Sequence, residues 1–435
     1  MKHEKFHYRS LAEVSATAEV SATAQELDAF LPLQEDLSPL FQPLQIGDKT
    51  AANRIALQPM EGSDGLEDGT PGELTWRRYE RFARGGAGLI WFEAVATVPE
   101  GRASAHQLML TEKNLDEYKR IVAHIKETGL KANGYEPIVV MQSTNSGRYS
   151  KPTGVPDPLI AYHCPPLEEP LLDDSHLLSD DTLKRFTDAF EPAAKLARQA
   201  GFDGVDVKCC HRYLACELLS AFTRPGKYGG SYENRTRFIK EAFAAAKSGI
   251  GDGFLTSRMN AYDGFEYPWG WGVKEGGGLA VDLTEPLRLI GELKAQYNLP
   301  LLNITMGNPY KNPHVNRPYD NGNYVPPEHP IEGLSRVMKG LSDIQHAYPD
   351  LPILGSAFSY LRKFAPNLAA GMVGGGHVAM AGFGRMAFAN PDFPNQLREK
   401  GEIDKVCMTC GNCAVLLRAG RCAGCVIHDR EVYKL

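Results

Sequence analysis

Eight short apolar runs, each followed by a stretch with helical periodicity, recur through most of the chain. Their starts lie mostly about 35 to 70 residues apart in a sequence of 435 residues. Strands that alternate with helices in this way predict βα units and a parallel sheet. Eight such units are the number that closes a (β/α)₈ barrel, the TIM barrel. The eight predicted strands are residues 54–60, 88–95, 136–143, 204–209, 254–260, 301–307, 352–357 and 377–383.

An open, doubly wound α/β sheet is the structural alternative. That architecture is expected to carry a G-x-G-x-x-G motif where the first strand turns into a helix. The chain has no such motif there, and the glycine-rich segment 270–276 has the wrong spacing and no strand directly before it. We therefore predict an α/β TIM barrel over residues 40–400, an N-terminal arm over 1–39 and a short cysteine-rich segment over 401–435.

Charge and hydropathy narrow the class of partner. The net charge is −6, and no basic stripe is interleaved with aromatic residues, so we expect a small-molecule substrate and no nucleic acid. No apolar run approaches the roughly 18 residues that span a membrane, and residues 1–40 contain no signal-peptide core. These absences predict a cytoplasmic protein without a membrane anchor. The odd number of cysteines, nine, favours reduced thiols over a disulfide framework.

Polar and ionisable side chains follow the predicted strands, at the end where parallel barrels place their chemistry. The fourth strand runs into Lys208, His211 and Tyr213 in the stretch GVDVKCCHRY. Gln142 offers a donor and an acceptor to an imide edge, and Arg258 can stabilise negative charge on a ring. Loops after the last two strands often form a phosphate site. The remaining strand-end residues complete a set suited to a flavin with one phosphate: Pro59, Met60, Glu61, Ala94, Ser356, Gly384 and Arg385.

Five motifs of the chain resemble the old yellow enzyme family of FMN-dependent oxidoreductases, over residues 40–400. They are NRIALQPM (53–60), GLIWFEAVATVPEGR (88–102), MQSTNSGR (141–148), HRYLACELLSAFTRPGKYGGSYENR (211–235) and GFGRMAFANPDF (382–393). The resemblance implies bound FMN. The flavin would be lined by Pro59, Met60 and Ala94, and its polar edge would be held by Gln142 and Arg258. Its phosphate would be received by Gly384 and Arg385.

The resemblance also implies that Tyr213 donates a proton. Reduction of a C=C bond further needs a group that holds the carbonyl oxygen as enolate charge develops, and Lys208 and His211 can provide it. A nearby Lys208 cation is expected to lower the pKa of Tyr213. Two positions depart from the family. Glu61 stands where many members have Cys or Thr beside the flavin, which leaves the redox tuning open, and Lys208 stands where a His or Asn is common, which leaves the substrate class open.

The cysteine-rich segment has the spacing of a metal site. Cys407, Cys410, Cys413 and Cys425 form C-x2-C-x2-C-x11-C, which suits a [4Fe–4S] cluster. A zinc ribbon with Cys422 in place of Cys413 satisfies tetrahedral zinc equally well. The segment is similar to that of the iron–sulfur branch of the same family, which includes trimethylamine dehydrogenase and 2,4-dienoyl-CoA reductase. This similarity favours the cluster and leaves Cys422 as a free thiol.

We expect an FMN- and [4Fe–4S]-dependent oxidoreductase that reduces an activated C=C bond conjugated to a carbonyl. One alternative is an amine dehydrogenase or demethylase that passes electrons out through the cluster. The other is an electron-transfer flavoprotein subunit, which the ionisable groups after the fourth strand argue against. The related proteins continue into nucleotide-binding domains, whereas this sequence stops at Leu435. We therefore expect a ferredoxin or flavoprotein as electron donor, with NAD(P)H as the direct alternative.

Overall fold

The computed structural model describes residues 3–25, 30–318 and 324–435, and a ring of parallel strands forms its centre. The strands are β3 (Ile55–Leu57), β4 (Leu89–Ala96), β5 (Ile138–Thr144), β6 (Gly204–Val207), β7 (Phe254–Thr256), β8 (Arg258–Asn260), β9 (Leu302–Thr305), β10 (Ile353–Gly355) and β11 (Met380–Phe383). They follow the order β7-β6-β5-β4-β3-β11-β10-β9-β8. Every neighbouring pair in that order is parallel.

The predicted barrel of eight strand units is confirmed, with one refinement in the fifth unit. The segment 254–260 contains both β7 and β8, separated by Ser257 alone. The hydroxyl of Ser257 donates to the Val207 carbonyl (2.7 Å), while its own carbonyl accepts from Asn303 N (3.0 Å). Cys209, just after β6, bonds to β8 through its N–H (2.9 Å to Arg258 O) and its carbonyl (2.8 Å from Asn260 N). The ring is therefore closed.

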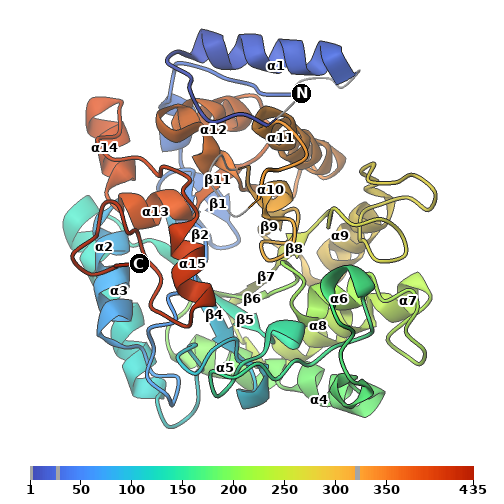
Figure 1. Ribbon diagram of the computed structural model, residues 1–435. Coiled ribbons are helices and arrows are strands. Elements are labelled where there is room, and N and C mark those ends of the chain that lie inside the picture. The colour runs from blue at the N-terminus through green and yellow to red at the C-terminus, as the bar shows by residue number, and fades with distance from the viewer. Residues whose placement is uncertain (1–2, 26–29, 319–323) are drawn as a thin grey trace.

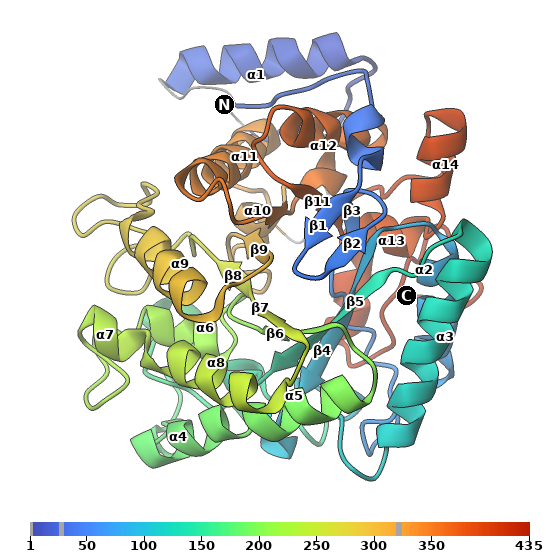
Figure 2. The ribbon, with the colours of Figure 1, turned by 180° about the vertical axis from the view of Figure 1, so that it is seen from behind.

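Helices surround the ring on its outer side (Figures 1 and 2). Their amphipathic spacing places an apolar face against the strands: α3 buries Tyr118, Ile121, Val122 and Ile125 and ends at Gly134, whose φ of +81° requires glycine. The helices are α1 (Leu11–Gln25), α2 (Glu73–Arg84), α3 (Leu115–Asn133), α4 (Asp180–Asp188), α5 (Phe190–Gln199), α6 (Leu214–Leu219), α7 (Tyr232–Arg235), α8 (Arg237–Gly249), α9 (Thr284–Tyr297), α10 (Pro313–Asn316), α11 (Pro330–Ala347), α12 (Ala365–Gly374), α13 (Arg385–Ala389), α14 (Phe393–Lys400) and α15 (Asn412–Arg418).

The inside of the ring is a small apolar core that is closed at one end. Trp91, Val140 and Leu354 are among its buried side chains. The antiparallel hairpin of β1 (Leu44–Ile46) and β2 (Lys49–Ala51) packs against this core through Ile46 and Ala51. Figure 2 shows the hairpin across the ring on the side away from α15. Because this end is plugged, only the carboxyl ends of the strands are left to receive a ligand.

The segment before the barrel packs on its outside. Helix α1 lies against α11, and Tyr8, Val14 and Ala18 are buried. In Figure 1 it runs along the edge formed by α11 and α12. Helix α1 contains the six-residue unit AEVSAT written twice, over residues 12–23. No helix among the described residues is long and apolar enough to cross a membrane.

The cysteine-rich segment lies over the carboxyl ends of the strands, with α15 in front of them in Figure 1. Ala423 N donates to Gly62 O (2.7 Å), in the loop after β3. Arg418 donates from Nη2 to Pro309 O (2.7 Å). Asp429 makes ion pairs with Arg77 (2.7 Å) and Arg81 (2.6 Å) of α2. These contacts, from three places along the segment, fix it to the mouth of the barrel.

Candidate active site

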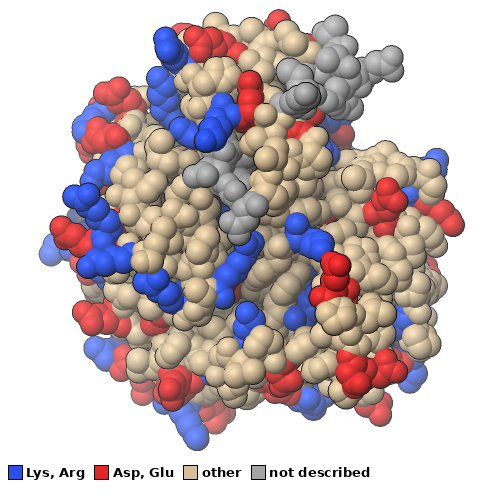
Figure 3. Space-filling view, in the orientation of Figure 1, with Lys and Arg blue, Asp and Glu red and all other residues tan. Residues whose placement is uncertain are grey.

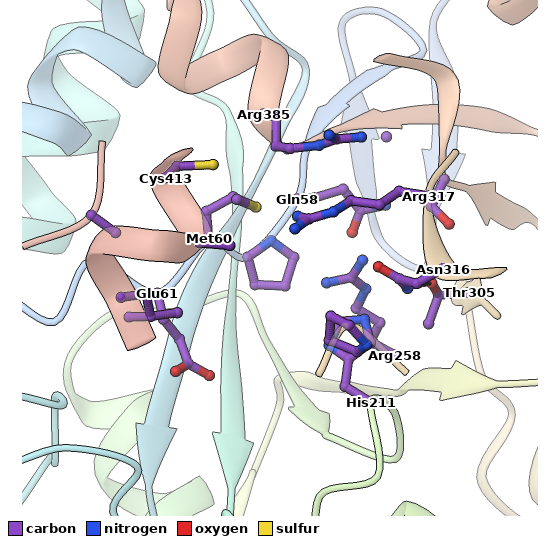
Figure 4. Close-up of a pocket in the computed structure, with 18 of the residues that line it drawn as sticks. Gln58, Met60, Glu61, His211, Arg258, Thr305, Asn316, Arg317, Arg385 and Cys413 are labelled. Carbon is purple, nitrogen blue, oxygen red and sulfur yellow. Dashed lines mark hydrogen bonds between the residues drawn. The ribbon is translucent and has the colours of Figure 1, made fainter. Parts of the chain in front are cut away.

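A cavity of about 160 Å³, partly open to solvent, lies between the strand ends and the cysteine-rich segment. Figure 3 shows Lys and Arg side chains gathered around a hollow on this face, and Figure 4 shows the lining in close-up. The sequence-predicted residues that line it are Pro59, Met60, Glu61, Gln142, Lys208, His211, Tyr213, Arg258, Ser356, Gly384, Arg385 and Cys413.

Ala94, which the family resemblance places against the flavin, is not among the residues that line this cavity. Strand β4 has an irregular register between Phe92 and Ala94, opposite Met141 and Gln142 of β5. The Ala94 side chain is fully buried, and its carbonyl accepts from Gln107 Nε2 (3.1 Å). The preceding side chain, Glu93, turns to an ion pair with Arg78. Ala94 therefore contributes to the wall behind the cavity and not to its surface.

Asp206, on strand β6, fixes the orientation of two predicted flavin ligands. Its Oδ2 accepts from Gln142 Nε2 (2.6 Å) and Trp91 Nε1 (2.8 Å), and its Oδ1 accepts from the Arg258 backbone N–H (2.7 Å). Burial raises the pKa of Asp206 to about 6, although these donors oppose the shift. Because Nε2 of Gln142 is engaged, Oε1 remains as the acceptor that Gln142 can offer a ligand.

Three arginines give the cavity an excess of positive charge. Within the described part of the chain, the guanidinium groups of Arg258, Arg317 and Arg385 have no carboxylate partner. Both Arg258 and Arg385 are more than nine-tenths buried. Even so, Arg258 Nε and Arg385 Nη1 have no hydrogen-bond partner. Burial lowers the pKa of Arg258, and burial with the neighbouring Arg385 lowers that of Arg317 to about 10. Buried cations without partners are costly, so this arrangement indicates an anionic ligand.

A flavin phosphate fits this part of the cavity. Figure 4 shows the side chains of Arg317 and Arg385 extending into the same space. Gly384 adjoins it, and a Cβ added there would lie 2.7 Å from Met60 Sδ, so only glycine leaves Met60 in place. Arg258 can donate and the Gln142 side-chain oxygen can accept, which is what the polar edge of a flavin ring requires.

Glu61, Lys208 and Tyr213 form one hydrogen-bonded group. Lys208 Nζ makes an ion pair with Glu61 Oε1 (3.0 Å), and the Tyr213 hydroxyl donates to the same oxygen (3.0 Å). The Tyr213 and Tyr310 hydroxyls are also 3.0 Å apart. The positive charge of Lys208 therefore neutralises Glu61 within the cavity, which removes most of the repulsion that an isolated carboxylate would exert on an anionic ring.

The expected lowering of the Tyr213 pKa by Lys208 was wrong. The pKa of Tyr213 is raised well above 10, first by burial and then by Glu61 and Tyr310. The Lys208 ammonium does lie 3.5 Å from the centroid of the Tyr213 ring. However, Glu61 is in direct contact with the hydroxyl that would become charged, so it outweighs the cation. The phenol holds its proton tightly until a strong base is placed against it.

His211 points an unpaired nitrogen into the site. Its φ is +62°, and the following Arg212 has a φ of +61°, so two consecutive residues occupy the left-handed region. Nε2 of His211 is buried without a hydrogen-bond partner. Burial, followed by the charges of Arg258 and Lys208, lowers the pKa of His211 well below 6.5. His211 is therefore neutral and can donate or accept one hydrogen bond with a ligand.

Four of the five cysteines in the cysteine-rich segment interact electrostatically with one another, and the fifth, Cys422, lies apart from them. Cys413 and Cys410 act on the pKa of Cys407, and the same two residues act on the pKa of Cys425; burial is the main reason that both values are raised. Cys422 has Asp64, Arg78 and Arg421 as its charged neighbours. Backbone N–H groups of Thr409 and His428 donate to the sulfurs of Cys407 and Cys425, both at 3.4 Å.

Cys413, and not Cys422, lies with Cys407, Cys410 and Cys425, which is the grouping that the four-cysteine set of an iron–sulfur cluster requires. N–H donors to sulfur are typical around such clusters. Among the described residues, no three His, Cys, Asp or Glu side chains are gathered closely enough to hold a single metal ion.

Several lining residues were missed in the sequence. They come mainly from the loop after β9 and from α15, and include Thr305, Tyr310, Asn316, Arg317, Arg418 and Ala423. Gln58 was also missed; it exchanges hydrogen bonds with Asn303 (2.7 and 3.2 Å). The loop after β9 is rich in Pro, Asn and Tyr without a motif. An arginine in such a loop carries no signal of where it will point.

The fold and the lining of this cavity define a class, a TIM barrel with a site suited to a flavin. The model of the NADH:flavin oxidoreductase / NADH oxidase family matches residues 39–272, more than half of the chain. The chain belongs to this family. The NADPH dehydrogenase of Geobacillus thermodenitrificans is 33% identical over 242 residues, which are 54% of this chain and 66% of that protein. The match thus spans slightly less than two thirds of this relative.

Solved structures share the fold at low sequence identity. A 2-naphthoyl-CoA reductase in complex with 2-naphthoyl-CoA has a TM-score of 0.73 at 20% identity, covering 91% of this chain and 57% of that chain. The old yellow enzyme homologue from Zymomonas mobilis has a TM-score of 0.62 at 22% identity, covering 84% and 94%. Histamine dehydrogenase from Rhizobium sp. 4-9 has a TM-score of 0.61 at 19% identity, covering 84% and 48%.

Proposed function

We propose that this flavin-dependent oxidoreductase reduces a C=C bond conjugated to a carbonyl group, using FMN and a [4Fe–4S] cluster. The observation that carries the proposal is the placement of Tyr213, His211 and Lys208 in the same cavity as the unpaired Arg258 and Arg385. A relative named as an NADPH dehydrogenase and a structural neighbour named as a 2-naphthoyl-CoA reductase are consistent with reductive chemistry.

FMN, when bound, supplies a hydride to the substrate. Gln142 and Arg258 would hold the polar edge of its ring, and Arg385 with Arg317 would hold its phosphate. Met60, kept in place by Gly384, would pack against it. Glu61 and Ser356 complete the lining assigned to the cofactor side of the cavity.

The residues of strand β6 and its following loop would act on the substrate. Neutral His211 can donate to the carbonyl oxygen through its unpaired nitrogen. Lys208 has three N–H donors, of which one meets Glu61, so it can also contact that oxygen. Both contacts strengthen as enolate charge develops. Tyr213 then gives its hydroxyl proton to the neighbouring carbon, and Tyr310, 3.0 Å away, can pass a proton to Tyr213.

The cluster, bound by Cys407, Cys410, Cys413 and Cys425, supplies a path for single electrons. Cys413 lines the same cavity as Met60 and Arg385, so this path ends at the flavin site. The electron donor would be a ferredoxin or flavoprotein, and direct reduction by NAD(P)H is the alternative. Replacement of Cys413 by Ser should lose iron while Cys422→Ser keeps it. Zinc released from Cys422→Ser, with iron never found, would establish the zinc ribbon instead.

Amine oxidation is the second candidate. The structural likeness to a histamine dehydrogenase and the presence of a carboxylate, Glu61, in the cavity favour it. A pure electron-transfer subunit is the third candidate, and it has no use for the Tyr213 and His211 pair. The deciding experiment is anaerobic: reduce the FMN protein, then mix it with a panel of enones, and separately mix the oxidised protein with a panel of amines. Flavin reoxidation by enones supports the proposal, and flavin reduction by amines overturns it.

A further inference from the structure

The ammonium group of Lys208 is enclosed by an acidic and an aromatic wall. Nζ lies 3.0 Å from Glu61 Oε1 and 3.5 Å from the centroid of the Tyr213 ring. The Lys208 side chain is 3% exposed and that of Glu61 is 14% exposed. The contact therefore lies inside the cavity, where a charge pair is screened little by solvent.

The aromatic wall is braced from behind. Tyr310 lies against Tyr213, with the two rings stacked at 6.4 Å and the hydroxyls 3.0 Å apart. Tyr149 stacks on Tyr310 at 3.9 Å between centroids, and its hydroxyl accepts from Asn308 Nδ2 (3.0 Å). Three rings and one amide thus hold the Tyr213 face in one orientation, whatever Lys208 does.

A carboxylate beside a fixed aromatic face is the arrangement that recognises ammonium ions in proteins. Here the ammonium belongs to the chain itself. We propose that Lys208 is an internal cation that fills an ammonium-binding cage made by Glu61 and Tyr213, and that it thereby excludes amines from the cavity. This inference rests on the proposed function, since it names the substrates that the same site rejects.

The selection follows from charge and space together. A substrate ammonium would have to share Glu61 with Lys208, and two cations at hydrogen-bond distance repel each other strongly in a buried site. A neutral carbonyl compound meets no such repulsion and gains an N–H donor from Lys208. The cage would therefore separate the two candidate substrate classes, and a single side chain would decide between them.

Removal of the Lys208 side chain beyond Cβ tests this idea directly. The deleted atoms, three carbons and one nitrogen, have the shape of n-propylammonium. The variants are Lys208→Ala, which leaves a hole of this shape, and Lys208→Met, which fills it with a neutral chain of similar length. Both are prepared with FMN bound, and flavin absorbance difference spectra and calorimetry measure binding of n-propylammonium and of the neutral n-propanol.

We expect Lys208→Ala to bind n-propylammonium at least about tenfold more tightly than either the unsubstituted protein or Lys208→Met. n-Propanol should not show this gain, and Glu61→Gln in the Lys208→Ala background should abolish it. Equal binding of the amine and the alcohol, or no gain over Lys208→Met, overturns the inference. Because only binding is measured, the outcome is independent of whether enones are turned over, and so of the proposed function.

Discussion

Two arginines buried beside neighbouring strands differ in how completely the chain satisfies them. Arg212 is fully buried and makes an ion pair with Asp263 (2.8 Å). It also donates to Tyr162 Oη (2.8 Å), Trp269 O (3.1 Å) and Ser220. Arg258 is 8% exposed, and within the described residues its guanidinium has no partner at all.

The difference separates a structural cluster from a ligand site. Both terminal nitrogens of Arg212 find acceptors within the chain, and only its Nε is buried without one. Arg212 can therefore hold the segment that follows β6 against the loop that contains Asp263. The free-energy cost of burying the Arg258 cation is offset only when a ligand with a hydrogen-bond acceptor or a negative charge enters the cavity. Burial and charge alone do not distinguish the two arginines; the count of satisfied donors does.

The sharpest test uses two adjacent residues, Arg212 and Tyr213. The first belongs to the structural cluster and the second to the ligand site. Tyr213→Phe should keep FMN and its rate of reduction but slow reduction of an enone by on the order of 10² to 10⁴-fold, because the proton donor is lost. Its unfolding free energy should change by only about 1 kcal/mol, the net value of a lost hydrogen bond. Rapid-mixing kinetics of the reduced protein measure the first effect.

An unchanged rate in Tyr213→Phe would assign proton donation to water. Arg212 is not an alternative donor, since its terminal N–H groups are held by Asp263 and Tyr162 outside the cavity lining.

Arg212→Met should lower the unfolding free energy by about 3–5 kcal/mol with or without FMN, because Asp263 is then left buried and unpaired. The matched control is Arg288→Met, whose ion pair with Glu233 is 50% and 61% exposed; it should cost less than about 1 kcal/mol. Chemical denaturation of the FMN-free and FMN-bound proteins gives both values. Equal losses in the two variants would show that the Arg212 cluster has no special structural role.

Asp206 resembles Arg212 in that its side chain is hydrogen-bonded within the chain, although it lies directly behind the cavity. Its pKa is raised from 3.8 to about 6 by burial. Since the folded state binds the proton more tightly, the stabilisation from this group is complete below about pH 4 and is lost as the pH rises through about 6. Relative to the unsubstituted protein, Asp206→Asn should therefore gain up to on the order of 3 kcal/mol between pH 4 and pH 7. The unfolding free energies of the two proteins are measured by denaturation at several pH values. A difference between them that does not change with pH would contradict this prediction.

Arg258→Gln should show the smallest effect and the opposite pattern from Arg212. Loss of a charged hydrogen-bond donor costs about 1.5–3 kcal/mol of FMN affinity, or roughly 10- to 150-fold. The FMN-free protein should be as stable as before or more stable, because an unpaired buried cation has been removed. Fluorescence titration with FMN gives the affinity. If the FMN-free variant were less stable than the FMN-free unsubstituted protein, Arg258 would be a structural residue like Arg212.

The sequence predicts the barrel well because strand and helix periodicities are local. It also predicts most of the cavity lining, since residues that end parallel strands must meet at one end of a closed ring. The Glu61–Lys208 contact joins residues 147 positions apart, and no local pattern encodes it. The direction of the Tyr213 pKa shift was missed for a similar reason: burial raises this pKa first, and Glu61 and Tyr310 raise it further. Arg317 and Tyr310 were missed for a related reason: the course of the loop after β9 sets their direction.

The docking of the cysteine-rich segment over the barrel has a consequence for the order of assembly. Cys413, Leu417, Arg418 and Ala423 form part of the cavity wall, yet the ribosome makes them after all eight barrel units. The strands can close into a ring while the mouth is still uncovered, so a flavin can enter from the side that these residues later occupy. A flavin that enters before the segment docks would then be covered by these residues.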